Sequence, residues 1–289
     1  MTDADSVAPA FERASLPPLI LRLAEVGTWT GSRERRARDW DQLQDDLESM
    51  SDELVRDLTK ITAEDGSTQS LCKDWSVRDV LAHLVSGDLR ATEALTTTFG
   101  QSAVTLGVVA RNLVAAEVRD PLGSLLRRFG EVRRRLLTVA ANLPPTAVSV
   151  YVPWVAGEIS VFALVQSRVM ETWIHGWDMR WPLKIAQPFD DRCWWLADIG
   201  VRHVPYALRL ANAGSDSCNL HVRLDGVAGG SWNRMIGLPP ARPVSISGPA
   251  WAWVTWASRR VPAQASAKHL SYASDDLASL VVETARSFA

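Results

Sequence analysis

Two histidines and an acid stand at positions that suit a divalent-metal site. Glu171 and His175 lie four residues apart in the stretch ETWIHGWD (171–178), and residues at this spacing project from one face of a helix. A carboxylate and an imidazole are usual zinc ligands, but two ligands are too few. His83, in a second helical pattern, is the candidate for the third. Three protein ligands leave a position open for water or substrate, which is the catalytic arrangement.

Apolar residues surround both ligand segments. Glu171 follows Val169 and Met170 and precedes Trp173 and Ile174. A buried carboxylate needs a partner, because desolvating it unpaired is costly. On spacing alone, the plainer interpretation is a surface acid beside a hydrogen-bonded core histidine. The apolar flanks favour the metal site over that interpretation.

Two further acids stand one helical turn from the histidines. Asp178 follows His175 and Asp79 precedes His83. Each is a candidate to accept the second imidazole N–H and fix the ring's tautomer, as outer carboxylates do in metal sites. Asp79 has a plainer alternative, which is to favour the first turn of its helix. Cys72 is a candidate nucleophile, but without a clear partner we expect it to be inert. The remaining histidines have no acid or cysteine at ligand spacing: His203, His221 and His269.

The elements that must position these residues follow from periodicity. Apolar residues at three- and four-residue steps predict four long amphipathic helices over 39–62, 76–98, 121–143 and 158–179, with Asp74 or Ser76 as cap of the second and a further helical stretch over 103–118. Such helices form a four-helix bundle, which builds metal sites from inward side chains. Past residues 182–188 the pattern predicts strands at 219–225, 231–236 and 243–247 between helices at 190–213, 250–258 and 275–288. We therefore expect a mainly α chain: an extension (1–38), a bundle (39–183) and a small α+β domain (184–289).

Composition narrows the class of protein. The chain has 289 residues, 47% hydrophobic and 22% charged, with a net charge of −2. Nothing in that charge favours nucleic acid or an anionic membrane as a partner. Three widely spaced cysteines suggest a reducing cytoplasm. The acidic N-terminus is not a signal peptide, and charges interrupt every long apolar run, so we expect no transmembrane helix.

Two motifs carry a resemblance to a known family. LCKDWSVRDVLAHL (71–84) resembles the GW-T/S-V-R-D-V-x-A-H-L motif of the mycothiol-dependent maleylpyruvate isomerase family, a branch of the DinB-like bundles. RVMETWIHGWD (168–178) resembles its R-x-x-E-x-x-x-H-G-x-D motif. The resemblance implies that His83, Glu171 and His175 bind a divalent metal, usually zinc, and that the second domain is sterol-carrier-protein-like. It also implies a W-L-x-G-R motif that supplies an active-site arginine, matched here by Arg260, with Arg259 in place of the glycine.

The resemblance implies a chemistry as well. Mycothiol binds the open metal position as a thiolate and attacks an electrophile, and a metal-coordinated thiol is indeed deprotonated near neutral pH. The leading hypothesis is thus a metal-dependent mycothiol S-transferase or isomerase, acting on an electrophilic small molecule such as a natural-product intermediate, as a monomer or homodimer. The alternatives are a metal-dependent hydrolase with metal-bound water and a non-catalytic protein that binds metal or carries an apolar ligand.

Overall fold

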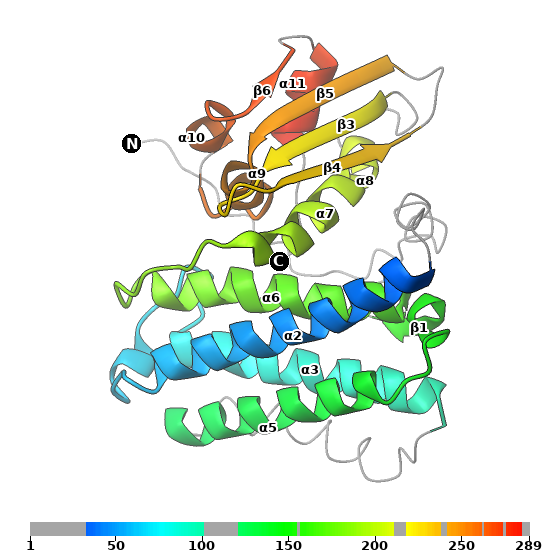
Figure 1. Ribbon diagram of the computed structural model, residues 1–289. Coiled ribbons are helices and arrows are strands. Elements are labelled where there is room, and N and C mark those ends of the chain that lie inside the picture. Colours follow the sequence, from blue (N-terminus) through cyan, green and yellow to red (C-terminus); the bar gives the residue numbers. More distant parts are fainter. Residues whose placement is uncertain are drawn as a thin grey trace.

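The computed structural model of the protein describes residues 33–100, 121–154, 157–210, 218–237, 242–261, 263–273 and 276–284. Two layers are visible in Figure 1: a bundle of long helices, and a smaller sheet with its own helices packed above it. Most of the expected N-terminal extension and the helical stretch expected over 103–118 lie outside the described residues. Among the described helices, none is long and apolar enough to cross a membrane.

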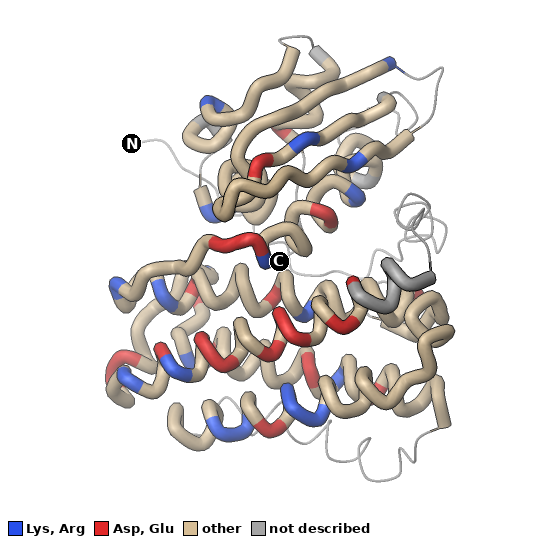
Figure 2. Tube along the Cα trace, in the orientation of Figure 1, with Lys and Arg blue, Asp and Glu red and all other residues tan. Residues whose placement is uncertain are grey.

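Four helices form the bundle: α2 (Arg33–Leu58), α3 (Val77–Thr98), α5 (Leu122–Ala141) and α6 (Val161–Arg180). Each overlaps most of an expected helix. Leucines of α2 at three- and four-residue steps are fully buried, and most leucines of α3 and α5 are buried too, which confirms the amphipathic patterns. Charged residues of both signs occur along α2 and α5 (Figure 2). The mainly α fold with a bundle followed by an α+β region is confirmed.

Local signals fix where α3 begins. Ser76 is its N-cap, because the Ser76 hydroxyl accepts from the amide of Asp79 while the Asp79 carboxylate accepts from the amide of Ser76. Asp74, the alternative cap, instead has a positive φ of 64° in the turn before the helix. The start of α3 sets the height at which His83 faces α6.

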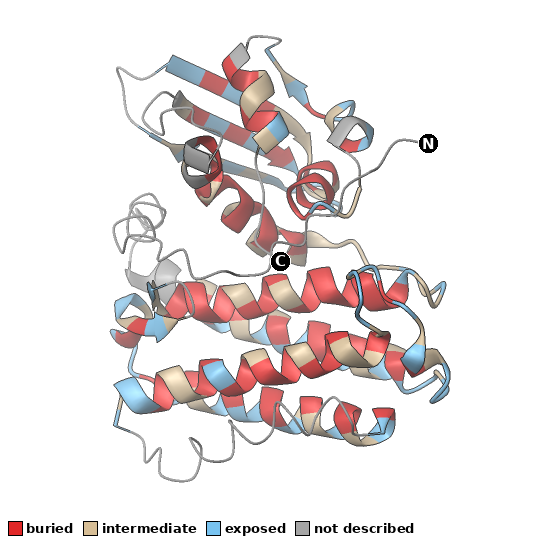
Figure 3. Cartoon of the chain, turned by 180° about the vertical axis from the view of Figure 1, so that it is seen from behind, coloured by how far each residue is buried: buried red, intermediate tan, exposed pale blue. Residues whose placement is uncertain are grey.

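Helix α6 starts later than expected. Residues Gly157–Ser160 are not helical but form β2, which pairs antiparallel with β1 (Tyr151–Trp154). Ser160 then caps α6 by accepting from the amide of Ala163 at 3.2 Å. Every residue of α6 is buried except Ser167 and Glu171, which are partly exposed. The reason is its place between the other bundle helices and α7 (Figure 3).

The second layer is a four-stranded sheet in the order β4-β3-β5-β6. Its strands are β3 (Cys218–Asp225), β4 (Ser231–Ile236), β5 (Arg242–Pro249) and β6 (Ser271–Tyr272); β3 and β5 run parallel, and the outer two pair antiparallel to them. Leu220, Val222 and Leu224 of β3 are buried, and the residues between them are exposed. This alternation confirms the half-buried strand expected there.

Five further helices belong to this region: α7 (Trp194–Arg202), α8 (Val204–Leu210), α9 (Ala250–Ala257), α10 (Ala263–Ala267) and α11 (Asp276–Thr284). The single helix expected over 190–213 is wrong, because it breaks at His203 between α7 and α8. Pro205 explains the break: it has no amide hydrogen to continue the helix, and its ring collides with the preceding turn. Strand β6 was not expected at all.

Candidate metal centre

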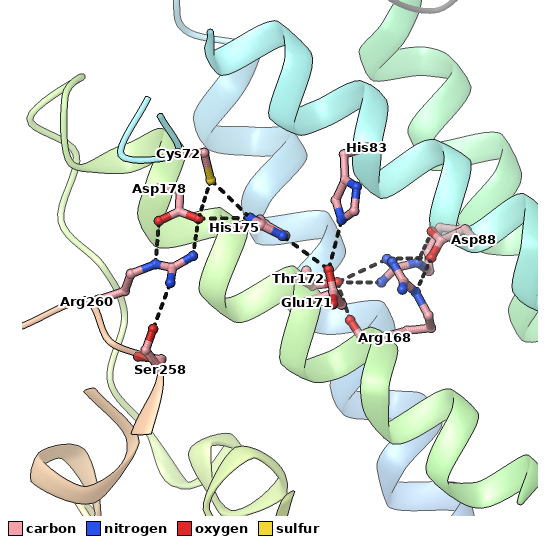
Figure 4. A network of polar contacts seen from close by, with 11 residues as sticks. Cys72, His83, Asp88, Arg168, Glu171, Thr172, His175, Asp178, Ser258 and Arg260 are labelled. Atoms are coloured by element: carbon pink, nitrogen blue, oxygen red, sulfur yellow. Dashed lines mark hydrogen bonds and ion pairs between the residues drawn. The ribbon is translucent and has the colours of Figure 1, made fainter. Parts of the chain in front are cut away.

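His83, Glu171 and His175 meet between α3 and α6. His83 Nε2 lies 3.0 Å from Glu171 Oε2, and His175 Nε2 lies 3.2 Å from the same oxygen. The two imidazole rings are 4.8 Å apart between centroids and nearly perpendicular. Figure 4 shows both rings directed at the Glu171 carboxylate. The expectation that the two sequence segments meet is therefore confirmed.

These three donors fit a divalent cation. One ligand atom from each residue lies within 4.8 Å of the other two. Two imidazole nitrogens and a carboxylate oxygen are a usual zinc donor set that leaves coordination positions open. The open side faces solvent past His83, whose side chain is 38% exposed, whereas that of His175 is only 6% exposed. Trp75 lies against His83, with 5.2 Å between the ring centroids.

Without a metal, the cluster is held together by shared protons. Burial by itself would raise the pKa of Glu171, but hydrogen bonds from His175 and His83 hold it well below its usual value. Burial would lower the pKa of His175, but its hydrogen bonds with Asp178, Cys72 and Glu171 raise it well above its usual value. A bound cation would replace the proton that His175 Nε2 shares with Glu171.

Asp178 holds the other edge of the His175 ring. Its side chain is fully buried, and its Oδ2 accepts from His175 Nδ1 at 2.8 Å. This is the contact expected of Asp178, and it leaves His175 Nε2 directed at the cluster. Burial would raise the pKa of Asp178, but hydrogen bonds from His175 and Arg260 lower it.

Arg260 reaches Asp178 from the sheet domain. Its Nε and Nη2 donate to the two carboxylate oxygens at 2.6 Å each, and its Nη1 donates to the Ser258 carbonyl at 2.7 Å. The bidentate pair ties the two layers together at the candidate site (Figure 4). Arg260 thus lies where the resemblance implies an active-site arginine, although its nearest anion is a residue of this chain.

The backbone conformation of Arg259 explains why the W-L-x-G-R pattern has a glycine at this position. Helix α9 ends in a Schellman motif: the Arg259 amide donates to the Trp256 carbonyl, and the Arg260 amide donates to the Thr255 carbonyl. The motif requires a left-handed residue at the position of Arg259, whose φ is 59°. Glycine is the usual residue there, as in the family pattern, and the alignment of Arg260 with the family arginine stays a prediction.

Cys72 has partners in the site that the sequence did not indicate. Its sulfur lies 3.1 Å from Asp178 Oδ2 and 3.8 Å from His175 Nδ1. We expected an isolated loop cysteine, and no local pattern signals this contact, because Asp178 lies 106 residues further along the chain. Cys72, His175 and Asp178 form a second group of potential metal ligands. The Arg260 guanidinium on both oxygens of Asp178 opposes a cation there, so His83, Glu171 and His175 are the better set.

Asp79 does not contact His83. Its Oδ2 accepts from the amide and hydroxyl of Ser76, at 2.8 and 2.6 Å. The structure therefore favours the plainer interpretation, in which Asp79 stabilises the first turn of α3. The other histidines lie away from the cluster: His221 on the exposed face of β3, His269 against Trp251 and His203 between α7 and α8, where burial lowers its pKa to about 3.

A second polar cluster lies in the bundle core beside the first. Asp88 is fully buried and accepts from Arg133 Nε at 2.7 Å and from Arg168 Nε at 3.0 Å. Arg133 also donates to Ser51 and Thr172, so that the cluster joins all four bundle helices. Arg168 lies over Gly87, where any side chain would collide with its guanidinium. Because Arg168 and Thr172 flank Glu171 on α6, this cluster fixes the turn that carries Glu171.

The fold and the cluster define a class of protein: a four-helix bundle with a histidine–carboxylate site between two helices, covered by an α+β domain. Residues 47–180 match the family model described as Mycothiol maleylpyruvate isomerase N-terminal domain. The family model therefore covers most of the bundle of this chain. The match contains His83, Glu171 and His175, and it ends before the sheet domain.

Solved structures extend the likeness to the whole fold. A crystal structure of the mycothiol-dependent maleylpyruvate isomerase matches with a TM-score of 0.54 and 16% identity, covering 81% of this chain and 92% of that one. A histidine-to-alanine mutant of that enzyme matches equally well, at 17% identity. Uncharacterized proteins from two strains of Mycobacterium tuberculosis are each 24% identical over 198 residues, which is 65% of this chain and 74% of each relative.

Proposed function

We propose that this protein is a metal-dependent enzyme that uses mycothiol, or a similar small thiol, to attack an electrophilic small molecule. The observation that carries the proposal is the convergence of His83 Nε2, His175 Nε2 and Glu171 Oε2 at one point that is open to solvent. The match of the bundle to a mycothiol-linked domain family supports a thiol as co-substrate. Transfer and isomerisation share this first step, the attack of a thiol sulfur.

Each residue has a role in this proposal. His83, Glu171 and His175 would hold zinc or a similar divalent ion. When bound, that ion supplies a positive charge that favours the thiolate form of an incoming thiol. Asp178 orients His175 by accepting from its Nδ1, and Trp75 packs against the His83 ring.

Arg260 has donors left for a substrate. A guanidinium carries five N–H donors. In Arg260, one N–H on each of Nε, Nη1 and Nη2 donates to a described residue. One N–H on each of Nη1 and Nη2 thus remains, and together they match the two oxygens of a carboxylate. We propose that Arg260 binds an anionic group of the electrophile while it still holds Asp178.

Metal analysis and kinetics test the proposal together. The purified protein should carry close to one equivalent of zinc or a similar ion, and His83→Ala, Glu171→Ala and His175→Ala should each lose most of it. Glu131→Ala, an exposed acid on α5, is the matched control and should keep it. Turnover of an electrophile such as maleylpyruvate should require both the metal and added mycothiol.

Three other outcomes would contradict parts of the proposal. Normal metal content in the Glu171→Ala and His83→Ala proteins would remove these ligands from it. Turnover that needs metal but no thiol would favour a hydrolase with water in the open position. Metal removal that lowers stability while no thiol reaction is found would favour a structural ion in a binding protein.

A further inference from the structure

The thiol of Cys72 belongs to the hydrogen-bonding shell of Asp178. Asp178 Oδ2 accepts from His175 Nδ1 at 2.8 Å, from Arg260 Nη2 at 2.6 Å and from Cys72 Sγ at 3.1 Å. Arg260 and Cys72 approach the carboxylate from opposite sides (Figure 4). Because the Asp178 side chain is fully buried, water is not at hand to replace a lost donor.

The loop before α3 holds Cys72 firmly. The Cys72 amide donates to Ser70 Oγ at 3.0 Å, and the Cys72 carbonyl accepts from the Gln69 side chain at 2.7 Å and from the Trp75 amide at 3.1 Å. One residue earlier, the Leu71 amide donates to the Asp178 carbonyl at 3.2 Å. The loop is thus tied to the backbone of Asp178 as well as to its side chain. A sulfur held in this way has little freedom to leave.

The position of the sulfur bears directly on His175. It lies 3.8 Å from His175 Nδ1, on the ring edge opposite Glu171. From there it donates to the carboxylate that orients the ring and also limits how far the ring can turn. Without it, Arg260 would pull Asp178 towards the sheet domain with no opposing donor except the imidazole itself.

We infer that Cys72 is a positioning residue of the candidate metal centre, which acts through Asp178 to hold His175 with Nε2 directed at Glu171 and His83. The inference deepens the proposed function and rests on it for the metal. Cys72 is not itself a ligand here, because the guanidinium of Arg260 lies on the same carboxylate. For this positioning role, the side chain at position 72 must be a hydrogen-bond donor of similar size, and the thiol stays protonated throughout.

Substitutions at Cys72 separate a donor from a space-filling side chain. Cys72→Ala removes the donor, whereas Cys72→Ser keeps one, because a hydroxyl also donates. Cys193→Ala is the matched control, since Cys193 is a buried cysteine at the start of α7, away from the cluster. Affinity for Zn²⁺ and Co²⁺ is measured by competition with a chromophoric chelator, on samples whose melting temperatures show that they are folded. The tautomer of His175 is read from its ¹⁵N signals in the metal-free protein.

Cys72→Ala should weaken metal binding about ten- to a hundredfold, as loss of an outer partner does. Cys72→Ser should stay within about threefold of the native affinity, since its hydroxyl replaces the donor, and Cys193→Ala should match the native protein. In the metal-free protein, Cys72→Ala should shift the His175 ¹⁵N signals and Cys72→Ser should restore them. Native affinity and native His175 signals in Cys72→Ala would overturn the inference, as would an equal loss in Cys72→Ser. If the native protein bound no metal, the proposed function would fail, and the His175 signals would still decide the role of Cys72.

Discussion

Two polar clusters lie side by side in the bundle, and they differ in how completely their groups are paired. In the core cluster, both oxygens of the fully buried Asp88 accept from guanidinium groups, and Arg133 has an acceptor for every one of its nitrogens. In the candidate metal centre, two imidazoles share a single oxygen of Glu171. Asp88 and Arg133 in the first cluster are thus fully paired, although Nη2 of Arg168 is buried without a hydrogen-bond partner among the described residues. The second cluster is open to solvent at His83.

The difference teaches how to separate a structural cluster from a functional one on the same pair of helices. A buried carboxylate whose two oxygens already accept from guanidinium groups has none left for a cation, and its net effect is to fix the helices that supply its partners. A carboxylate between two imidazoles, with one side open to solvent, can instead share its oxygen with a cation. The same contrast separates two arginines, since Arg133 has no spare donor and Arg260 has two among the described residues.

Removing the negative charge from the core cluster should have the largest effect on stability. Asp88→Asn leaves Arg133 and Arg168 buried without a counter-charge, and we expect a loss of about 3–5 kcal/mol in the free energy of unfolding. Urea denaturation measures it, with the exposed Asp45→Asn on α2 as control, expected to change stability by less than about 0.5 kcal/mol. A small loss of unfolding free energy in Asp88→Asn would show that the complete pairing of Asp88 does not distinguish the core cluster from the candidate metal centre.

Substitution of Arg260 tests whether a guanidinium group with spare N–H donors binds the substrate. We expect Arg260→Ala, assayed with metal in excess so that the site is loaded, to lower turnover by one to three orders of magnitude, about 1.5–4 kcal/mol, because a bidentate donor to the substrate is lost. Arg260→Lys should recover little of it, since an ammonium lacks the planar fork. Unchanged kinetics with only a small loss of stability would leave Arg260 the role of capping α9 and pairing with Asp178.

The pH dependence of the metal-free protein tests the open cluster. The pKa of His175 is raised on folding, so its contribution is fully present below about 6.5, the ordinary value, and is lost as the pH rises through the raised pKa. Unfolding free energy should therefore fall by up to about 1.4 kcal/mol per pH unit above that value. The pKa values of Glu171 and Asp178 are lowered, so their contribution is lost only as the pH falls below about 4. Urea denaturation with a chelator, on native protein and His175→Gln, checks this; an equal slope in both would contradict it.

The smallest effect should come from Arg259, the neighbour of Arg260. Arg259→Gly and Arg259→Ala both remove its hydrogen bonds to the Glu283 and Thr284 carbonyls. Only glycine adopts the left-handed conformation without strain, so the glycine variant should be more stable than the alanine variant by about 1 kcal/mol. Melting temperatures measure the difference, and equal values would show that this turn carries no strain.

Much of the bundle could be predicted from the sequence, because its signals are local. The three- and four-residue spacing of leucines places α2, α3 and α5, and the Ser76 cap starts α3 within a residue of the expected position. The spacing of Glu171 and His175 put both on one helix face. The boundary expected at residues 183 and 184 stays a prediction, since one continuous hydrophobic core includes residues of both layers, such as Trp173 and Leu196.

The sequence by itself therefore determined the helices and which of their side chains share a face. Only the tertiary structure decided which faces meet. It brought Cys72 to Asp178 across 106 residues, bound Asp79 to Ser76 instead of His83, and gave Arg260 a carboxylate of this chain as its nearest anion. The physical reason is that spacing along a helix is fixed by its 3.6-residue period, whereas pairing across helices depends on which buried donors and acceptors satisfy one another after packing.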